Sequence, residues 1–263
     1  MLIVTDGVAN HSNRLFQNIH FEAFCKEHGI RYRNPSLHDM APLYGLKAGS
    51  FDKLECRIYA GLERRNLFHA MNFEEGQGDL AAMARSLERG GIHFVTGWMF
   101  KVKDLTEKYQ DFFIKKYTLL PSFYEDTPLY EQFSSVDTDK YARIAVHIRR
   151  GDYKTWEGGK YYYEDKDYLG LIDRMRGLVR EQLGKESLFY IFTNDKVYLD
   201  GVGICVSDNS WYVDQFIMSR CDYIIGPPST FSLWASYTGL TPFYHVKDKS
   251  KEFTLQDFEL CHG

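Results

Sequence analysis

The chain has 263 residues, of which 44% are apolar and 26% are charged. This length and composition predict a folded protein of one large domain or two smaller ones, and they exclude a disordered or low-complexity chain. The formal net charge of −4 disfavours a general nucleic-acid-binding protein, which normally carries a basic surplus. The aromatic content of 16% is high and indicates large hydrophobic cores.

Neither a membrane segment nor a metal site is predicted. No stretch reaches the ~18 apolar residues of a spanning helix, and the apolar run at the start is too short for a signal peptide. The cysteines are odd in number, far apart and free of any C-x-x-C pair. This usage is typical of reduced thiols, so we expect a cytoplasmic protein with no integral membrane contact.

The N-terminal half predicts a less regular α/β domain over residues 1–135. Apolar patterns indicate strands at 2–5 and 93–96 and helices at 13–28, 51–62, 80–87 and 105–116. The polar segment 134–140 is a candidate linker to the second domain.

The C-terminal half, residues 136–263, shows a clearer alternation of strands and helices. Strands are predicted at 142–148, 188–193, 203–206, 222–225 and 241–246, with helices at 168–182, 211–220 and 230–237. This alternation predicts a doubly wound parallel sheet. Ligands of such sheets bind at the carboxyl ends of the strands, so we expect the loops after Ile148, Thr193 and Ile225 to share one ligand-binding edge.

Two features at this predicted edge suit an anion. Arg149 and Arg150 follow the first strand, and a guanidinium is a forked donor that matches phosphate. Ser229 and Thr230 open a helix, whose free N–H groups bind anions. The alternatives are a surface turn with an Arg–Asp pair and a simple helix N-cap at Ser229.

Other patterns carry weaker signals. Asn13 and Arg14 follow the first strand of the chain, where they form either a ligand-facing loop or the start of a surface helix. The Arg150-Gly151-Asp152 tripeptide directly follows a core strand, which disfavours an adhesion motif. Two D-x-D patterns, at 137–139 and 165–167, are typical of metal-dependent glycosyltransferases. Neither follows an apolar strand, so no metal site is expected there.

An aromatic loop follows the two arginines. It contains Tyr153, Trp156, Tyr161, Tyr162 and Tyr163. Sugar faces stack on aromatic rings, so the loop either binds a sugar or pins itself to the domain as a small hydrophobic cluster.

The segment His147 to Tyr153 resembles the H-x-R-R-G-D-Y signature of the α-1,2-fucosyltransferases of glycosyltransferase family 11. Segments 13–17, 191–195 and 214–234 also resemble motifs of that family, in the expected order. Three departures stand out. The glycine-rich lead-in to Asn13 is absent, Arg14 replaces a glutamine, and Pro228 replaces an asparagine.

The resemblance implies a GT-B arrangement, in which two Rossmann-like α/β domains face across a cleft. The N-terminal domain would hold the acceptor and the C-terminal domain GDP-fucose. The implied reaction is an inverting, metal-independent transfer of fucose to a hydroxyl of an acceptor glycan, on a galactose-type acceptor with α-1,2 linkage and without a cofactor. The alternatives are another GDP-sugar or linkage, or a non-catalytic protein that binds nucleotides or carbohydrates.

Residue roles follow from the same resemblance. Arg149 would bind the β-phosphate and His147 would lie near the nucleotide sugar. The other expected donor-binding residues are Arg150, Asn194, Asp195, Ser229, Thr230, Phe231, Asn13 and Arg14. Arg149 and the helix start at Ser229 can stabilise charge on the departing GDP without a metal. The candidate bases are Asp152 and Glu157, with Asp6 and His11 as alternatives, although Asp152 could instead hold Arg150 in place.

Overall fold

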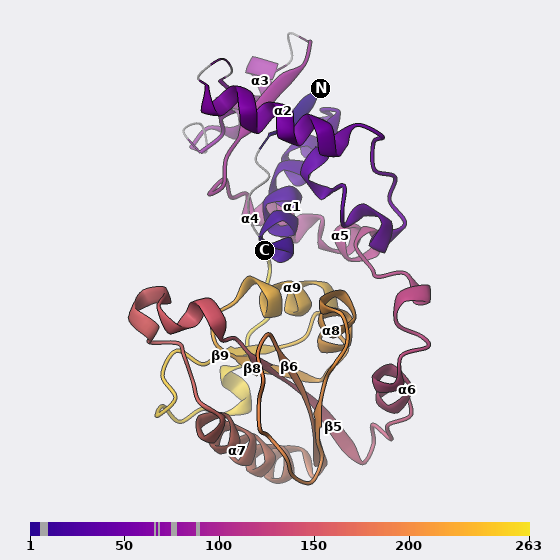
Figure 1. The fold of residues 1–263 in the computed structure, drawn as a ribbon, viewed down its shortest axis with the longest axis vertical. Coiled ribbons are helices and arrows are strands. Elements are labelled where there is room, and N and C mark those ends of the chain that lie inside the picture. Colours follow the sequence, from indigo (N-terminus) through magenta and orange to yellow (C-terminus); the bar gives the residue numbers. More distant parts are fainter. Residues whose placement is uncertain (6–9, 66, 68, 75–77, 88–89) are drawn as a thin grey trace. The chain divides into compact units, whose positions relative to one another are not determined.

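The computed structural model describes residues 1–5, 10–65, 67, 69–74, 78–87 and 90–263. They form two compact units, Met1–Tyr117 with His262–Gly263, and Thr118–Cys261 (Figure 1). The division falls between Tyr117 and Thr118, whereas the sequence suggested a boundary at 135/136. The candidate linker 134–140 lies inside the second unit, between α6 (Pro128–Ser134) and β5 (Tyr141–Ile148).

Unit 1 contains a parallel sheet with the strand order β2-β1-β4-β3. Its strands are β1 (Leu2–Val4), β2 (Tyr32–Arg33), β3 (Met71–Asn72) and β4 (His93–Thr96), and its helices are α1 (His11–Glu27), α2 (Asp52–Arg64), α3 (Leu80–Leu87), α4 (Lys103–Lys108) and α5 (Gln110–Lys116). The predicted helix 105–116 is divided at Tyr109. The two-residue strands β2 and β3 were missed, because such short runs carry no periodicity.

The core of unit 1 accounts for part of the aromatic excess. Phe21 and Phe24 of α1 pack against Phe73 and Phe100, with ring centroids 5.0 to 6.0 Å apart. All four rings are fully buried. Tilted and edge-on contacts of this kind stabilise a core beyond the area that they bury.

Unit 2 contains a parallel sheet with the strand order β7-β6-β5-β8-β9. Besides β5 the strands are β6 (Glu186–Thr193), β7 (Ile204–Val206), β8 (Tyr223–Gly226) and β9 (Phe243–His245), and besides α6 the helices are α7 (Asp165–Leu183), α8 (Trp211–Met218) and α9 (Thr230–Gly239). The predicted doubly wound parallel sheet is confirmed.

The chain adds β6 and β7 on one side of β5 and then β8 and β9 on the other. The strand order therefore reverses between β5 and β8, which is the point where ligands of such sheets bind.

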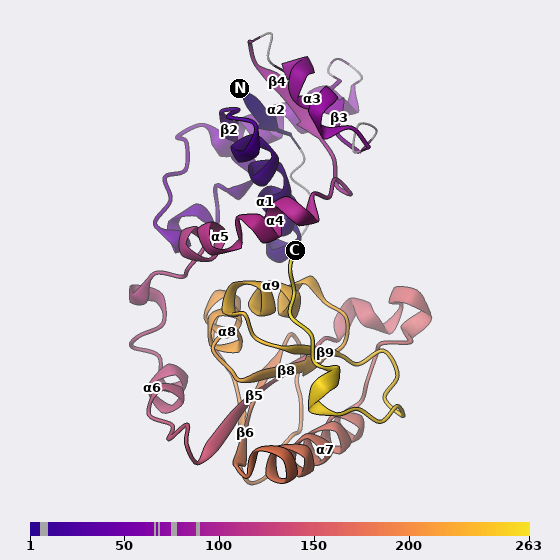
Figure 2. The same cartoon turned by 180° about the vertical axis from the view of Figure 1, so that it is seen from behind.

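The alternation of side chains along β5 sets the two faces of this sheet. Ile144, Val146 and Ile148 belong to the core cluster that includes the apolar face of α7. His147 points the other way and contacts α9. Figures 1 and 2 show α7 on one face of the sheet and α8 and α9 on the opposite face. Successive strand residues face opposite sides, so this register also determines where the residues just after β5 point.

No helix in the described part of the chain is both long enough and apolar enough to cross a membrane.

Candidate functional site

The point where the strand order reverses in unit 2 is tightly packed. At Gly226, the last residue of β8, an added Cβ would lie 2.5 Å from the carbonyl oxygen of His147 and 2.9 Å from its Cβ. Only glycine permits this approach of backbone to backbone. The loops that follow β5 and β8 therefore begin side by side.

The alternation along β5 directs Arg149, two residues after His147, to the same side of the sheet as His147. Nη2 of Arg149 is 2.9 Å from Oδ1 of Asp152, and its guanidinium carbon is 5.6 Å from the ring centre of Tyr153. The Arg149 side chain is 24% exposed and that of Asp152 is 61% exposed. An ion pair with so exposed a partner contributes little stability, so an anionic ligand can replace Asp152 at small cost.

The start of α9 supplies the second half of the site. Ser229 is the N-cap, and its Oγ accepts a hydrogen bond from the Phe231 N–H at 3.2 Å. The N–H groups of the first helical turn and the helix dipole favour an anion at this end. The Tyr153 hydroxyl donates to the carbonyl of Pro228, so the loop after β5 is tied directly to the loop after β8. The N-cap and the anion-binding interpretations of Ser229 are compatible.

His147 is a buried, uncharged member of the site. Its Nδ1 is 3.1 Å from Oγ of Ser232, and its ring centre is 5.3 Å from that of Phe231. Burial, with a contribution from the charge of Arg149, lowers the pKa of His147 to about 3. It is therefore neutral at physiological pH and can orient a ligand but adds no positive charge.

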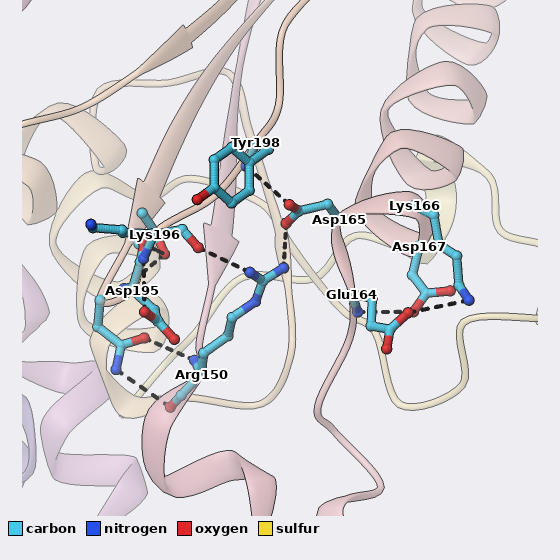
Figure 3. A network of polar contacts seen from close by, with 10 residues as sticks. Arg150, Glu164, Asp165, Lys166, Asp167, Asp195, Lys196 and Tyr198 are labelled. Carbon is cyan, nitrogen blue, oxygen red and sulfur yellow. Dashed lines mark hydrogen bonds and ion pairs between the residues drawn. The ribbon is translucent and has the colours of Figure 1, made fainter.

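Arg150 points to the opposite face, toward α7 (Figure 3). Its guanidinium donates to Asp165 and, at 3.1 Å, to the carbonyl of Lys196. Asn194 holds the main chain of Arg150 from both sides, with contacts of 2.8 and 3.4 Å. The expectation that Asp152 might hold Arg150 was wrong, because the alternation of the strand sends the two arginines to different faces. Asp195 is exposed, and its Oδ1 accepts the Lys196 N–H at 2.8 Å.

The aromatic loop combines anchored and exposed rings. The Trp156 ring lies 4.7 Å from that of Tyr153 and 5.3 Å from that of Tyr161. Tyr153 is buried, whereas Trp156 is 41% exposed. Glu157 has a left-handed backbone with φ of 51° and pairs with Lys160 at 3.0 Å. A non-glycine residue in this conformation is strained and is often found at functional sites.

The site residues expected in unit 1 lie at the start of α1. Arg14 is nearly buried, and its guanidinium makes two hydrogen bonds to Asp39, at 2.9 and 2.8 Å, and one to the Ser36 carbonyl. Asn13 is half-buried in the same first turn. Burial and the Arg14 charge lower the pKa of His11. Asp6 lies outside the described residues.

Asp214 is a polar group of unit 2 that the sequence analysis did not single out. This α8 residue is buried, and its Oδ1 accepts a hydrogen bond from Ser207, the first residue after β7. Burial raises the pKa of Asp214 to about 7. No pattern of residue types marks such a carboxyl, because its burial depends on how α8 packs on the sheet.

The D-x-D patterns make contacts within the protein. Asp165 binds Arg150, and Asp167 forms a capping box with Glu164 and pairs with Lys249 at 2.9 Å. In the other pattern, Oδ1 of Asp137 accepts the Asp139 N–H at 3.1 Å in the turn before β5.

No protein-family model matches the chain, and no curated protein sequence matches it. Solved structures do match. The structure of NodZ α-1,6-fucosyltransferase soaked with GDP-fucose matches with a TM-score of 0.55 and 12% sequence identity. The match covers 93% of this chain and 94% of the NodZ chain. A second structure, fucosyltransferase NodZ from Bradyrhizobium, has a TM-score of 0.56 at the same identity and coverage. The structure of POFUT1 in complex with GDP matches with a TM-score of 0.55 and 11% identity, over 93% of this chain and 97% of the POFUT1 chain.

The fold is similar to that of these solved fucosyltransferase structures. The α/β fold class with parallel sheets, expected from the sequence, is thereby confirmed. At this level of identity the match concerns the fold, so the membership in glycosyltransferase family 11 and the α-1,2 linkage stay predictions.

Proposed function

We propose that this protein transfers fucose from GDP-fucose to a hydroxyl group of an acceptor glycan. The observation that carries the proposal is that the loops after β5 and β8, which lead to Arg149 and to the start of α9, begin side by side where the strand order of unit 2 reverses, and that Tyr153 joins them. Two solved structures of similar fold support it, one soaked with GDP-fucose and one in complex with GDP.

The diphosphate of the donor would lie between the Arg149 guanidinium and the first turn of α9. A forked guanidinium and free helix N–H groups are both suited to phosphate oxygens. Ser229, Thr230 and Phe231 would form the helix side of this cradle, with neutral His147 beneath it. Asp195, in the turn after β6, is proposed as a contact to the hydroxyl groups of the donor. Arg14 is already engaged by Asp39.

The reaction is a single displacement. The acceptor oxygen forms a bond to C1 of fucose while the bond between C1 and the phosphate oxygen breaks, and the electron pair of that bond leaves with GDP. Arg149 and the N–H groups of α9 stabilise the negative charge that develops on GDP, so we propose that no metal ion or other cofactor is required. The acceptor proton passes to a carboxylate.

Asp152 and Glu157 are the proposed candidates for this carboxylate. Asp152 pairs with Arg149 in the described structure, so a donor phosphate that takes Arg149 would release the Asp152 carboxylate for the acceptor. Asp152→Asn and Glu157→Gln distinguish the two. The variant that loses transfer and still binds GDP identifies the base, and full transfer by both variants would show that neither serves.

Calorimetric titration with GDP, GDP-fucose and UDP tests the proposed donor. We expect both guanine nucleotides to bind at least about tenfold more tightly than UDP. Turnover with a panel of acceptors should persist in EDTA. Tighter binding of another GDP-sugar would identify that sugar nucleotide as the donor instead of GDP-fucose. Binding of GDP-fucose without transfer to any acceptor would instead indicate a non-catalytic binding protein.

The linkage is the finer part of the proposal. The resemblance of the sequence to family 11 favours an α-1,2 bond to a galactose-type acceptor, whereas NodZ is an α-1,6-fucosyltransferase. Digestion of the product with linkage-specific fucosidases decides between them. An α-1,6 product would overturn the α-1,2 assignment and leave the proposed donor unchanged.

A further inference from the structure

The two neighbouring arginines of unit 2 have separate roles. We infer that Asp165 and Arg150 form a clamp that positions Arg149, and that Arg150 does not itself bind the donor. This inference rests on the proposed function, because it concerns how the proposed diphosphate site is held in shape.

The guanidinium of Arg150 is committed to the protein interior. Arg150 is 7% exposed, and its two terminal nitrogens donate to Lys196 and Asp165. Its backbone N–H and carbonyl are both held by the side chain of Asn194. Figure 3 shows the Arg150 side chain reaching toward Lys196 and Asp165. Arg150 therefore joins the turn after β5 to the loop after β6.

Asp165 completes the connection. Its Oδ1 accepts from Arg150, and its Oδ2 accepts from the Tyr198 N–H at 3.0 Å. It is the first residue of α7, where the helix dipole favours a carboxylate. One side chain thus holds the turn after β5, the loop after β6 and the start of α7 against one another.

The start of α7 is itself fixed. The Glu164 N–H donates to Asp167 at 3.0 Å, which forms one half of the capping box, and Lys249 pairs with Asp167 at 2.9 Å. The carboxylate of Asp165 therefore projects from a firmly placed helix end. The D-x-D pattern, which in other glycosyltransferases suggests a metal, here supplies one carboxylate for the clamp and one for the helix cap.

Arg149 depends on this arrangement because it is the adjacent residue in the same turn. Arg149 forms an ion pair with the exposed Asp152, which holds the Arg149 side chain only weakly. The backbone of the turn sets the direction in which the Arg149 side chain leaves the main chain, and the Asp165–Arg150 clamp holds that backbone. Small displacements of a binding group at a reaction site are costly.

The direction in which one substitution changes the affinity for GDP distinguishes a positioning clamp from a direct contact to the ligand. If Arg150 bound the diphosphate, Asp165→Asn would release Arg150 and remove a nearby negative charge, so GDP would bind equally well or more tightly. If Asp165 positions the turn, the same substitution weakens GDP binding. We expect the dissociation constant for GDP to rise about tenfold or more in Asp165→Asn, and Asp165→Glu, which keeps the carboxylate, to recover part of the loss.

Asp167→Asn is the matched control. It removes a negative charge and the Lys249 ion pair from the same helix turn, while its amide oxygen can still accept the Glu164 N–H of the capping box, and Asp167 has no ion pair with Arg150. Calorimetry with GDP and thermal unfolding are measured for the wild type and both variants. We expect the Asp167→Asn variant to bind GDP as the wild type does. Equal losses in the two variants would assign the effect to the helix start and overturn the clamp.

A second variant keeps the test interpretable if the first variant does not fold. Should Asp165→Asn not fold, the apolar pair Arg150→Met with Asp165→Leu removes both charges together, a replacement that folded proteins often tolerate. We expect this double variant to fold and to bind GDP about tenfold more weakly. Wild-type GDP affinity in either variant overturns the clamp and leaves the proposed function standing, whereas a wild-type protein that binds neither GDP nor GDP-fucose overturns both.

Discussion

The two units each place an arginine after the first strand of a parallel sheet, but the two arginines are bound differently. In unit 1, Arg14 follows β1 and makes two hydrogen bonds to Asp39 and one to the Ser36 carbonyl, with its side chain 9% exposed. In unit 2, Arg149 follows β5 and pairs only loosely with an exposed aspartate. Arg14 in the first turn of α1 thus stabilises the fold of unit 1, whereas Arg149, directly after β5, belongs to a candidate ligand site.

The strands explain part of this difference. β1 has three residues and β5 has eight, and β5 is paired along its length with β6. A long, paired central strand holds the turn that follows it, so a charged side chain there can be left available for a ligand. Where the sheet is short, the neighbouring loop is held by its own polar contacts, as Arg14 holds the segment around Asp39.

The largest effect is expected at Arg149. Arg149→Ala should lower the rate of fucose transfer by about 10²- to 10³-fold, because the developing charge on GDP loses its guanidinium partner. Circular dichroism should show an unchanged fold. Wild-type turnover in a folded Arg149→Ala variant would show that the donor diphosphate is bound elsewhere.

The close packing of β8 against β5 is the next test. Gly226→Ala should destabilise the protein by about 3 kcal/mol, because the added Cβ meets the His147 backbone, which has no room to move. The control is Gly177→Ala in the middle of α7, where nothing lies within 4 Å of an added Cβ. That change should stabilise by about 0.5 to 1 kcal/mol. Chemical denaturation of both variants measures the contrast, and equal stabilities would refute the tight packing.

Arg14 should affect stability more than binding. Arg14→Ala removes a nearly buried guanidinium and its hydrogen bonds to Asp39 and Ser36, which should cost about 2 kcal/mol. We expect the affinity for GDP to stay within about threefold of wild type, a change of less than 1 kcal/mol. Thermal unfolding and calorimetry together test this, and a loss of GDP affinity of about tenfold or more would show that Arg14 also takes part in binding.

Two buried groups, Asp214 in unit 2 and His20 in unit 1, change the stability of the protein with pH in opposite directions. The pKa of Asp214 is raised to about 7 from 3.8, so the folded state keeps a proton that the unfolded state releases. The stability that Asp214 contributes therefore falls as the pH rises from 4 to 7, by about 1.4 kcal/mol per pH unit. In unit 1, burial lowers the pKa of His20 to about 3, so stability through His20 falls as the pH drops below 6.5.

Asp214→Asn isolates the first of these effects. The variant should gain stability relative to wild type as the pH rises from 4 to 7, when unfolding is followed at several pH values. Parallel stability curves for the two proteins would mean that Asp214 titrates normally.

Much of the fold could be predicted from the sequence because its signals are local. The strands of unit 2 are continuous apolar runs, and the apolar positions of α7 repeat with the period of a helix. The shared edge after Ile148, Thr193 and Ile225 was predicted from the parallel topology alone. Unit 1 was harder, because β2 and β3 have two residues each and helix 103–116 is divided at Tyr109.

The partners of charged groups were harder to predict than the elements that carry them. The sequence places Arg149, Arg150 and Asp152 close together, but it does not show which face each side chain takes. Arg150 binds Asp165, fifteen residues along the chain, and Arg14 binds Asp39. These pairings depend on packing between elements, and so does the burial of Asp214.

The Pro227–Pro228 pair before α9 has a thermodynamic consequence. Proline rings restrict the backbone even in the unfolded chain, and the carbonyl of Pro228 is further fixed by the Tyr153 hydroxyl. The first turn of α9 is therefore already ordered before any anion arrives. Little conformational entropy remains to be lost there, so a phosphate that docks at this helix end should bind with a small entropic penalty.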